Sequence, residues 1–161
     1  MALPKLETPT YELEQPSTGE TIKYRPFLVK EQKTLMMAQE SGDDKQIKTA
    51  LASLISGCTF EKLDPYEIPL FDVEFLFLRI RGKSVGEKID LNLLCPDDNE
   101  TRVNKSVNLE EIGVNMKVGH TNEIEITDKI KIFMRYPTLN DMEDVDAGTA
   151  NSQTVFKMIK D

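Results

Sequence analysis

The sequence predicts an α+β domain in which helices pack on one face of an antiparallel sheet. Apolar residues recur at helical spacing in the first half of the chain, and apolar and polar residues alternate in the second half. The expected order of elements is therefore β-β-α-α-α-β-β-β-α. A length of 161 residues suits a single domain over residues 1–161.

The first 27 residues predict an N-terminal hairpin. Tyr11 and Leu13 precede the turn segment PSTG, and Ile22 and Tyr24 follow it in TIKYRPF. Alternating apolar residues on both sides of a segment with Pro and Gly are typical of two short strands joined by a turn.

Residues 28–82 predict helices. A first helix begins at Leu28 and ends near Gly42, where Asp43 or Asp44 can cap the next helix. The second helix has one apolar face with the 3.6-residue repeat, formed by Ile47, Leu51, Leu54, Ile55 and Cys58. A third helix of about 12 residues is expected in PLFDVEFLFLRIRG, with Gly82 and Gly86 bracketing the loop after it. We expect the apolar face of the second helix to pack on four residues of the third: Val73, Leu76, Phe77 and Ile80.

Residues 87–137 predict antiparallel strands. One half-buried strand contains Ile89, Leu91 and Leu93, and its partner across the turn Cys95–Glu100 contains Val103, Val107 and Leu109. A longer alternation puts six large side chains at even positions: Ile124, Ile126, Ile130, Ile132, Met134 and Tyr136. This segment is either one long strand or two strands joined at Thr127-Asp128-Lys129.

The C-terminal part predicts an acidic loop at 141–149 and a helix at 150–161. The segment NSQTVFKMIKD begins with a capping residue and has Val155, Phe156 and Ile159 at helical spacing. Since the sequence stops inside this segment, we expect a truncated or naturally short C-terminus.

Composition narrows the class of protein. A net charge of −8 makes nucleic-acid binding a poor first hypothesis, because affinity for phosphates comes from clustered Lys and Arg. The longest apolar stretch, near Val73 to Ile80, is too short and too charged to span a bilayer. The N-terminus lacks the pattern of a secretory signal. With two cysteines, we expect a reducing cytosol and no disulfide.

The segment LLCPDDNE raises the question of a metal site. A structural zinc site takes four ligands in close Cys and His pairs, whereas this chain has only Cys58, Cys95 and His120, far apart in sequence. Asp97 and Asp98 lack the glycine and distal Glu of a calcium loop. We therefore expect a β-turn after Cys95 and no metal or cofactor.

No catalytic constellation stands out. His120 lies in the polar segment KVGHTNE, with no Ser or Cys nearby to activate. Two pairs of adjacent acids occur, Glu110/Glu111 and Asp97/Asp98, and within each pair the side chains should point in different directions and be solvated. A glycosidase instead needs one acid in an apolar wall. The sequence therefore predicts a protein that is not an enzyme.

Two strand ends offer candidate binding residues. In Tyr24-Arg25-Pro26 and Arg135-Tyr136-Pro137, a proline stops a strand with Arg and Tyr at its exit. Arg and Tyr are frequent anchors of protein interfaces. We predict an interface at Arg25, Arg135 and Tyr136, with a purely structural strand end as the alternative. Anchors of this kind should be removable without unfolding the chain.

Three segments carry a resemblance to a known family: TPTYELEQPSTGETIKYRPFLVKEQKTLMMA, IPLFDVEFLFLRIRGKSVGE and ITDKIKIFMRYPTLND. In this order they resemble the baseplate hub assembly proteins of T-even contractile-tailed bacteriophages. The resemblance covers nearly the whole chain. It implies a non-enzymatic part or assembly factor of the baseplate hub, acting with other hub proteins in the host cytoplasm during assembly, with the baseplate of the finished tail as the alternative location.

Two other functions stay open. One is a tail-associated hydrolase of cell-wall glycan, and the other is a nucleic-acid-binding module with a locally basic face.

Overall fold

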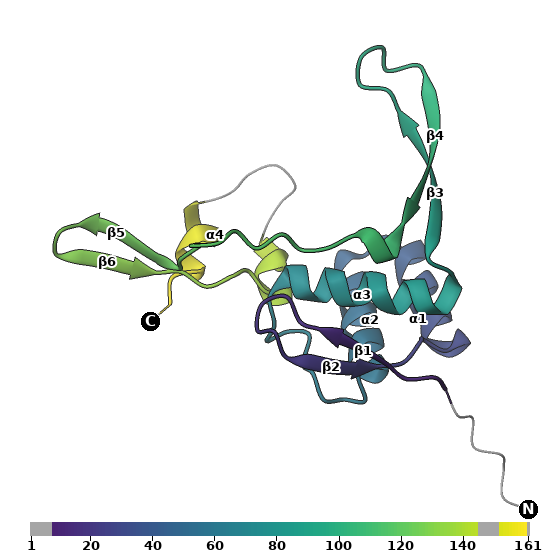
Figure 1. Ribbon diagram of the computed structural model, residues 1–161, viewed down its shortest axis with the longest axis horizontal. Coiled ribbons are helices and arrows are strands. Elements are labelled where there is room, and N and C mark those ends of the chain that lie inside the picture. The colour runs from purple at the N-terminus through teal and green to yellow at the C-terminus, as the bar shows by residue number, and fades with distance from the viewer. Residues whose placement is uncertain (1–7, 145–151, 161) are drawn as a thin grey trace, which may run out of the picture.

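The computed structural model describes residues 8–144 and 152–160, and it confirms the α+β class. A helical body carries one hairpin on its side, and two further hairpins project away from it (Figure 1). In chain order the elements are β1 (Tyr11–Glu14), β2 (Thr21–Tyr24), α1 (Val29–Ser41), α2 (Asp44–Cys58), α3 (Leu70–Val85), β3 (Lys88–Leu94), β4 (Arg102–Asn108), the 3-10 turn η1 (Leu109–Glu111), β5 (Glu123–Thr127), β6 (Ile130–Phe133), the 3-10 helix η2 (Leu139–Asp144) and α4 (Ser152–Lys157).

The predicted N-terminal hairpin is present as β1 and β2. The strands are antiparallel, with Tyr11 opposite Tyr24 and Leu13 opposite Ile22. The two tyrosine rings lie 5.7 Å apart. Tyr24 is buried against the helices, so the hairpin belongs to the core of the body.

Helices α1 and α2 are joined where the sequence predicts. Gly42 has a φ of +66°, a left-handed conformation that glycine adopts without a Cβ clash. Asp43 then caps α2 by accepting a hydrogen bond of 2.9 Å from the N–H of Lys45. Gly42 therefore ends one helix, and Asp43 starts the next.

The core forms where α2 meets α3. Leu54, Ile55 and Cys58 of α2 are buried with Val73, Leu76 and Ile80 of α3 in one cluster, which confirms most of the predicted packing. Leu51 and Phe77 are partly buried at its margin, whereas Ile47 lies outside the cluster of buried residues. Within the described ranges, no helix has the length and apolar character needed to cross a membrane.

Helix α3 is longer than predicted, and one expectation about it is wrong. Gly82 does not bracket a loop but lies inside the helix, buried beside Leu109 of η1. A single glycine costs a helix only about 1 kcal/mol, and the small residue leaves room for η1. The helix ends at Gly86, whose φ is +137°.

The strands do not form one sheet covered by helices on one face, as the sequence led us to expect. They form three separate antiparallel pairs, β1-β2, β3-β4 and β5-β6. Each strand pairs with its neighbour in sequence, and residues 112–122 separate the second pair from the third. The long alternation at 124–136 contains two strands with a turn at Asp128 and Lys129.

The C-terminal expectations are met in part. Residues 141–144, expected in a loop, belong to η2, and Asp141 is buried. Residues 145–149 lie outside the described part of the chain. The predicted helix at 150–161 corresponds to α4, which covers Ser152–Lys157.

Candidate protein interface

Tyr136 lies where the chain leaves β6 and reaches the start of α3. The N–H of Leu70 donates a 2.8 Å hydrogen bond to the carbonyl of Pro137, which fixes the exit against the helix. The Tyr136 ring contacts Phe71 edge to face at 5.0 Å and stacks on His120 at 6.0 Å. His120 is in an exposed loop, as predicted. Tyr136 keeps 37% of its surface exposed, so the ring is held on two sides and open on another.

A groove of about 750 Å³ opens beside Tyr136. Its walls come from the approach to α3, the loop before β5, the β5-β6 hairpin and the C-terminal segment. Among its lining residues are Glu67, Pro69, His120, Ile124, Met134 and Lys160. The groove is lined by apolar and polar side chains together, a composition that suits a side chain of a protein partner.

The β5-β6 hairpin continues the groove with an apolar face. Ile124 pairs with Ile132 across the hairpin and shares its face. Ile124 and Ile130 are 50% and 55% exposed. On the opposite face, Lys131 forms ion pairs with Glu123 and Glu125. The charged side chains of that face pair with one another, although Phe133 is exposed there, while Ile124 and Ile130 of the isoleucine face stay half exposed in the described part of the chain.

Arg135 lies just after β6, the second strand of this hairpin. Its guanidinium donates two hydrogen bonds, of 2.6 and 2.8 Å, to the carboxylate of Asp141 and one of 2.8 Å to the carbonyl of Lys157. Asp141 also accepts hydrogen bonds from the N–H and hydroxyl of Thr138. The guanidinium holds the pKa of Asp141 well below its ordinary value. Arg135 thus ties the strand exit to η2 and α4.

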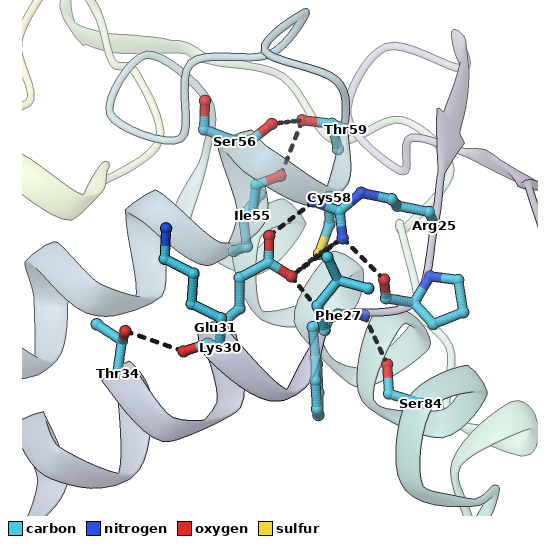
Figure 2. Close-up of polar contacts among 12 residues, drawn as sticks. Arg25, Phe27, Lys30, Glu31, Thr34, Ile55, Ser56, Cys58, Thr59 and Ser84 are labelled. Carbon is cyan, nitrogen blue, oxygen red and sulfur yellow. Dashed lines mark hydrogen bonds and ion pairs between the residues drawn. The ribbon is translucent and has the colours of Figure 1, made fainter. Parts of the chain in front are cut away.

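Arg25 has the same arrangement at the exit of β2. It donates hydrogen bonds of 3.0 and 2.6 Å to the two carboxylate oxygens of Glu31, as Figure 2 shows. Glu31 in turn accepts the N–H of Leu28 at 2.7 Å and so caps α1. Only 15% of the Arg25 side chain is exposed. The structure favours a role in folding for this guanidinium.

The three residues predicted as an interface therefore lie in two places. Arg135 and Tyr136 are adjacent at the groove. Arg25 lies elsewhere, between β2 and α1, where it pairs with Glu31. Because Arg135 ties three segments together, we expect its removal to loosen the fold, so that Tyr136 is the cleaner test of an anchor. Sequence reasoning missed both carboxylate partners. Their signal is an acid six residues after each Arg.

The two cysteines lie in the core and in a turn. Cys58 is fully buried, as predicted for core packing, and burial together with nearby Glu31 raises the pKa of its thiol to about 12. The backbone of Cys95 bonds with that of Thr101 and Asn99 in the β3-β4 turn. Asp98 accepts hydrogen bonds from Glu100 and Thr101 in that turn. In residues 8–144 and 152–160, no three His, Cys, Asp or Glu side chains converge as a metal site.

Each of the two acidic pairs considered for a hydrolase contains one residue whose pKa is lowered rather than raised. Glu110 forms a 2.5 Å ion pair with Lys83, and hydrogen bonding to Lys83 lowers the pKa of Glu110. Hydrogen bonding to Thr101 likewise lowers the pKa of Asp98. A glycosidase acid needs a raised pKa, which comes from an apolar environment.

The strand exits and the central helix belong to the three segments that carry the family resemblance. A family described as T4 bacteriophage base plate protein matches residues 8–161. The chain belongs to this family. Comparison with curated proteins and with solved structures finds no match. Membership identifies the chain as a phage baseplate protein, a component of the tail that associates with other baseplate proteins.

Proposed function

We propose that the chain is a non-enzymatic subunit or assembly factor of the baseplate hub, and that it acts by contacts with other hub proteins in the host cytoplasm. The observation that carries the proposal is the uncovered isoleucine face of β5-β6, which leads into the groove beside Tyr136. In a baseplate protein, a partner is the natural cover for such a face. Arg135 positions Tyr136 in this proposal, and an anchor role for Arg25 stays a separate prediction.

The side chains proposed to contact the partner are exposed in the free chain. Ile124, Ile130 and Tyr136 are all at least a third exposed, so their replacement removes little of the core of the chain. Surface substitutions of this kind usually change the free energy of unfolding by less than about 0.5 kcal/mol. The loss of one anchor from an interface typically costs about 2 kcal/mol, roughly thirtyfold in affinity.

The test replaces the apolar face in the full chain. Ile124→Asn with Ile130→Asn, and separately Tyr136→Ala, are supplied to infected cells whose phage lacks this gene, and completed baseplates are counted by electron microscopy. We expect both variants to keep their melting temperature and to lose assembly. Glu125→Asn, on the opposite face of the hairpin, is the matched control and should assemble normally. Normal assembly by folded variants of the isoleucine face would contradict the proposal.

The hydrolase alternative predicts clearing of a peptidoglycan zymogram by the purified chain. The nucleic-acid alternative predicts binding that weakens steeply with salt. We expect no clearing, because the lowered pKa of Glu110 does not suit a general acid. We expect no nucleic-acid binding, because the chain carries a net charge of −8.

A further inference from the structure

The β3-β4 hairpin projects from the C-terminal end of α3, away from the β5-β6 hairpin (Figure 1). Its register places three pairs on one face: Ile89 with Val107, Leu91 with Lys105, and Leu93 with Val103. Leu93 and Val103 are 48% and 55% exposed. A lone two-stranded hairpin is only marginally stable in water, so an apolar face of this length is best explained by a cover supplied from outside.

The opposite face of the hairpin is mostly polar, with Leu94 as its one large apolar side chain, and several of its polar groups bond with one another. Asn92 donates a 2.6 Å hydrogen bond to Asn104, and Arg102 donates one of 3.1 Å to Asn92. The carboxylate of Asp98 accepts a hydrogen bond from the N–H of Thr101 within the β3-β4 turn. Most of the exposed apolar side chains of the hairpin therefore lie on the other face, with Leu91, Leu93 and Val103.

Lys105 gives that face a charge. It lies in the middle row, across from Leu91, and no hydrogen bond or ion pair of its ammonium occurs among the described residues. The face has no carboxylate, because its other members are Ile89, Leu91, Leu93, Val103 and Val107. The two strands carry three basic side chains and one acidic side chain, although the whole chain is acidic.

These features point to a partner other than a second copy. In a symmetric contact this face would meet itself, and two lysines would be buried with no acid to pair them. A single cation in an apolar surface fits a protein with an apolar patch and one carboxylate. The butylene stem of Lys105 can then lie along the apolar contact while its ammonium pairs with the acid.

We propose that the apolar face of β3-β4, with Lys105 at its centre, docks on an acidic-apolar surface of a different protein. This contact goes beyond the proposed function, because it uses a separate hairpin and specifies the chemistry of its partner. The apolar residues supply the buried area, and the Lys105 ion pair fixes the register of the two proteins.

The test uses the full chain in cells that are assembling the baseplate. A photo-crosslinking phenylalanine analogue replaces Leu93 on the apolar face or, as control, Ser106 on the polar face. Mass spectrometry of crosslinked peptides then identifies the contacted residue. We expect a strong crosslink from position 93 to a different protein, near one of its carboxylates, and at most a weak crosslink from position 106.

Charge reversal completes the test. Lys105→Glu should lower the crosslink from position 93 by about tenfold or more, because like charges then face each other. Lys88→Glu, the same change on the polar face, should leave it unchanged, and both variants should keep the melting temperature of the parent. Replacing the partner's contacted acid with Lys should restore the crosslink to Lys105→Glu.

Several results would overturn the docking proposal: no crosslink from position 93, equal crosslinks from both faces, a crosslink to a second copy or to nucleic acid, an equal effect of Lys88→Glu, or no rescue by the partner's reversed charge. None of them depends on β5-β6, so failure here is distinguishable from failure of the proposed function.

Discussion

Two arginine-carboxylate clasps hold the strand exits of this protein. In each, an Arg before a proline pairs through both carboxylate oxygens with an acid six residues later: Arg25 with Glu31 and Arg135 with Asp141. Each acid also accepts a backbone N–H at the start of the next helical segment, from Leu28 or Thr138. One carboxylate thus neutralises the arginine and satisfies a helix terminus.

Gly57 permits the first clasp to lie against α2. A Cβ on Gly57 would stand 3.1 Å from Oε1 of Glu31, which is itself 2.6 Å from Arg25. We expect Gly57→Ala to lower the free energy of unfolding, because Glu31 cannot move without stretching the clasp. In a Glu31→Ala background the same change should stabilise the chain by about 1 kcal/mol through helix propensity.

Urea unfolding of the parent chain, both single variants and the double variant measures this coupling. Equal stabilisation by Gly57→Ala in both backgrounds would show that the clasp does not require a glycine.

The clasps also predict how stability depends on pH. Hydrogen bonding to the arginines lowers the pKa of Asp141 and of Glu31 in the folded chain. Their stabilising contribution is therefore complete above the unfolded carboxyl values of about 4 and is lost as pH falls toward the lower folded values. We expect the free energy of unfolding to decrease below about pH 4, and Asp141→Asn to reduce this decrease, with exposed Asp128→Asn as control. Parallel pH curves for Asp141→Asn and the parent chain would contradict this assignment.

At the scale of elements, Asp72 joins the β1-β2 hairpin to α3. Its buried carboxylate accepts hydrogen bonds of 2.7 Å from the Gln15 amide and 3.2 Å from the N–H of Ser17, and also bonds the Ser17 hydroxyl. Gln15 is buried as well. The turn of the hairpin is therefore attached to the helix by one side chain.

Asp72→Ala should lower the free energy of unfolding by about 1–3 kcal/mol, the usual cost of leaving a buried polar group unpaired. Hydrogen exchange should also become faster in residues 11–24 than in α2. Asp72→Asn keeps one acceptor oxygen and should have a smaller effect. An unchanged exchange rate in the hairpin would show that its packing on the helices, through Tyr24, is sufficient.

The sequence predicts an element well when its signal is a local pattern and poorly when it depends on contacts between distant segments. The apolar face of α2 and the alternation in the strands are local patterns, and they predicted the helices, the first hairpin and the existence of the later strands. The Asp141 and Asp72 contacts were missed because they depend on tertiary geometry. The single sheet was wrong because alternation shows that Leu93 or Ile124 belongs to an apolar face, but not what covers that face.

For the whole molecule, the buried core and the apolar surface belong to different parts. The core cluster lies in the helical body and the first hairpin, with Ile55, Val73 and Ile80 fully buried. The apolar faces of β3-β4 and β5-β6 lie outside it and are exposed. In the free chain, the hydrogen bonds between paired strands hold these hairpins together, and much of their apolar area stays accessible to partners.

This division predicts the pattern of hydrogen exchange in the free and the assembled protein. Protection from exchange follows the free energy of local opening, which is low for elements with few buried contacts. In the free chain, amides of β3-β4 and β5-β6 should exchange much faster than those of α2 and α3. In assembled baseplates both hairpins should become protected, while α2 and α3 should change little. If the hairpins in the free chain are already as protected as α2, they unfold together with the body as one cooperative domain, as the single-domain prediction expects, and their stability needs no partner. If they stay unprotected in the baseplate, their apolar faces are not the surfaces that other baseplate proteins bind.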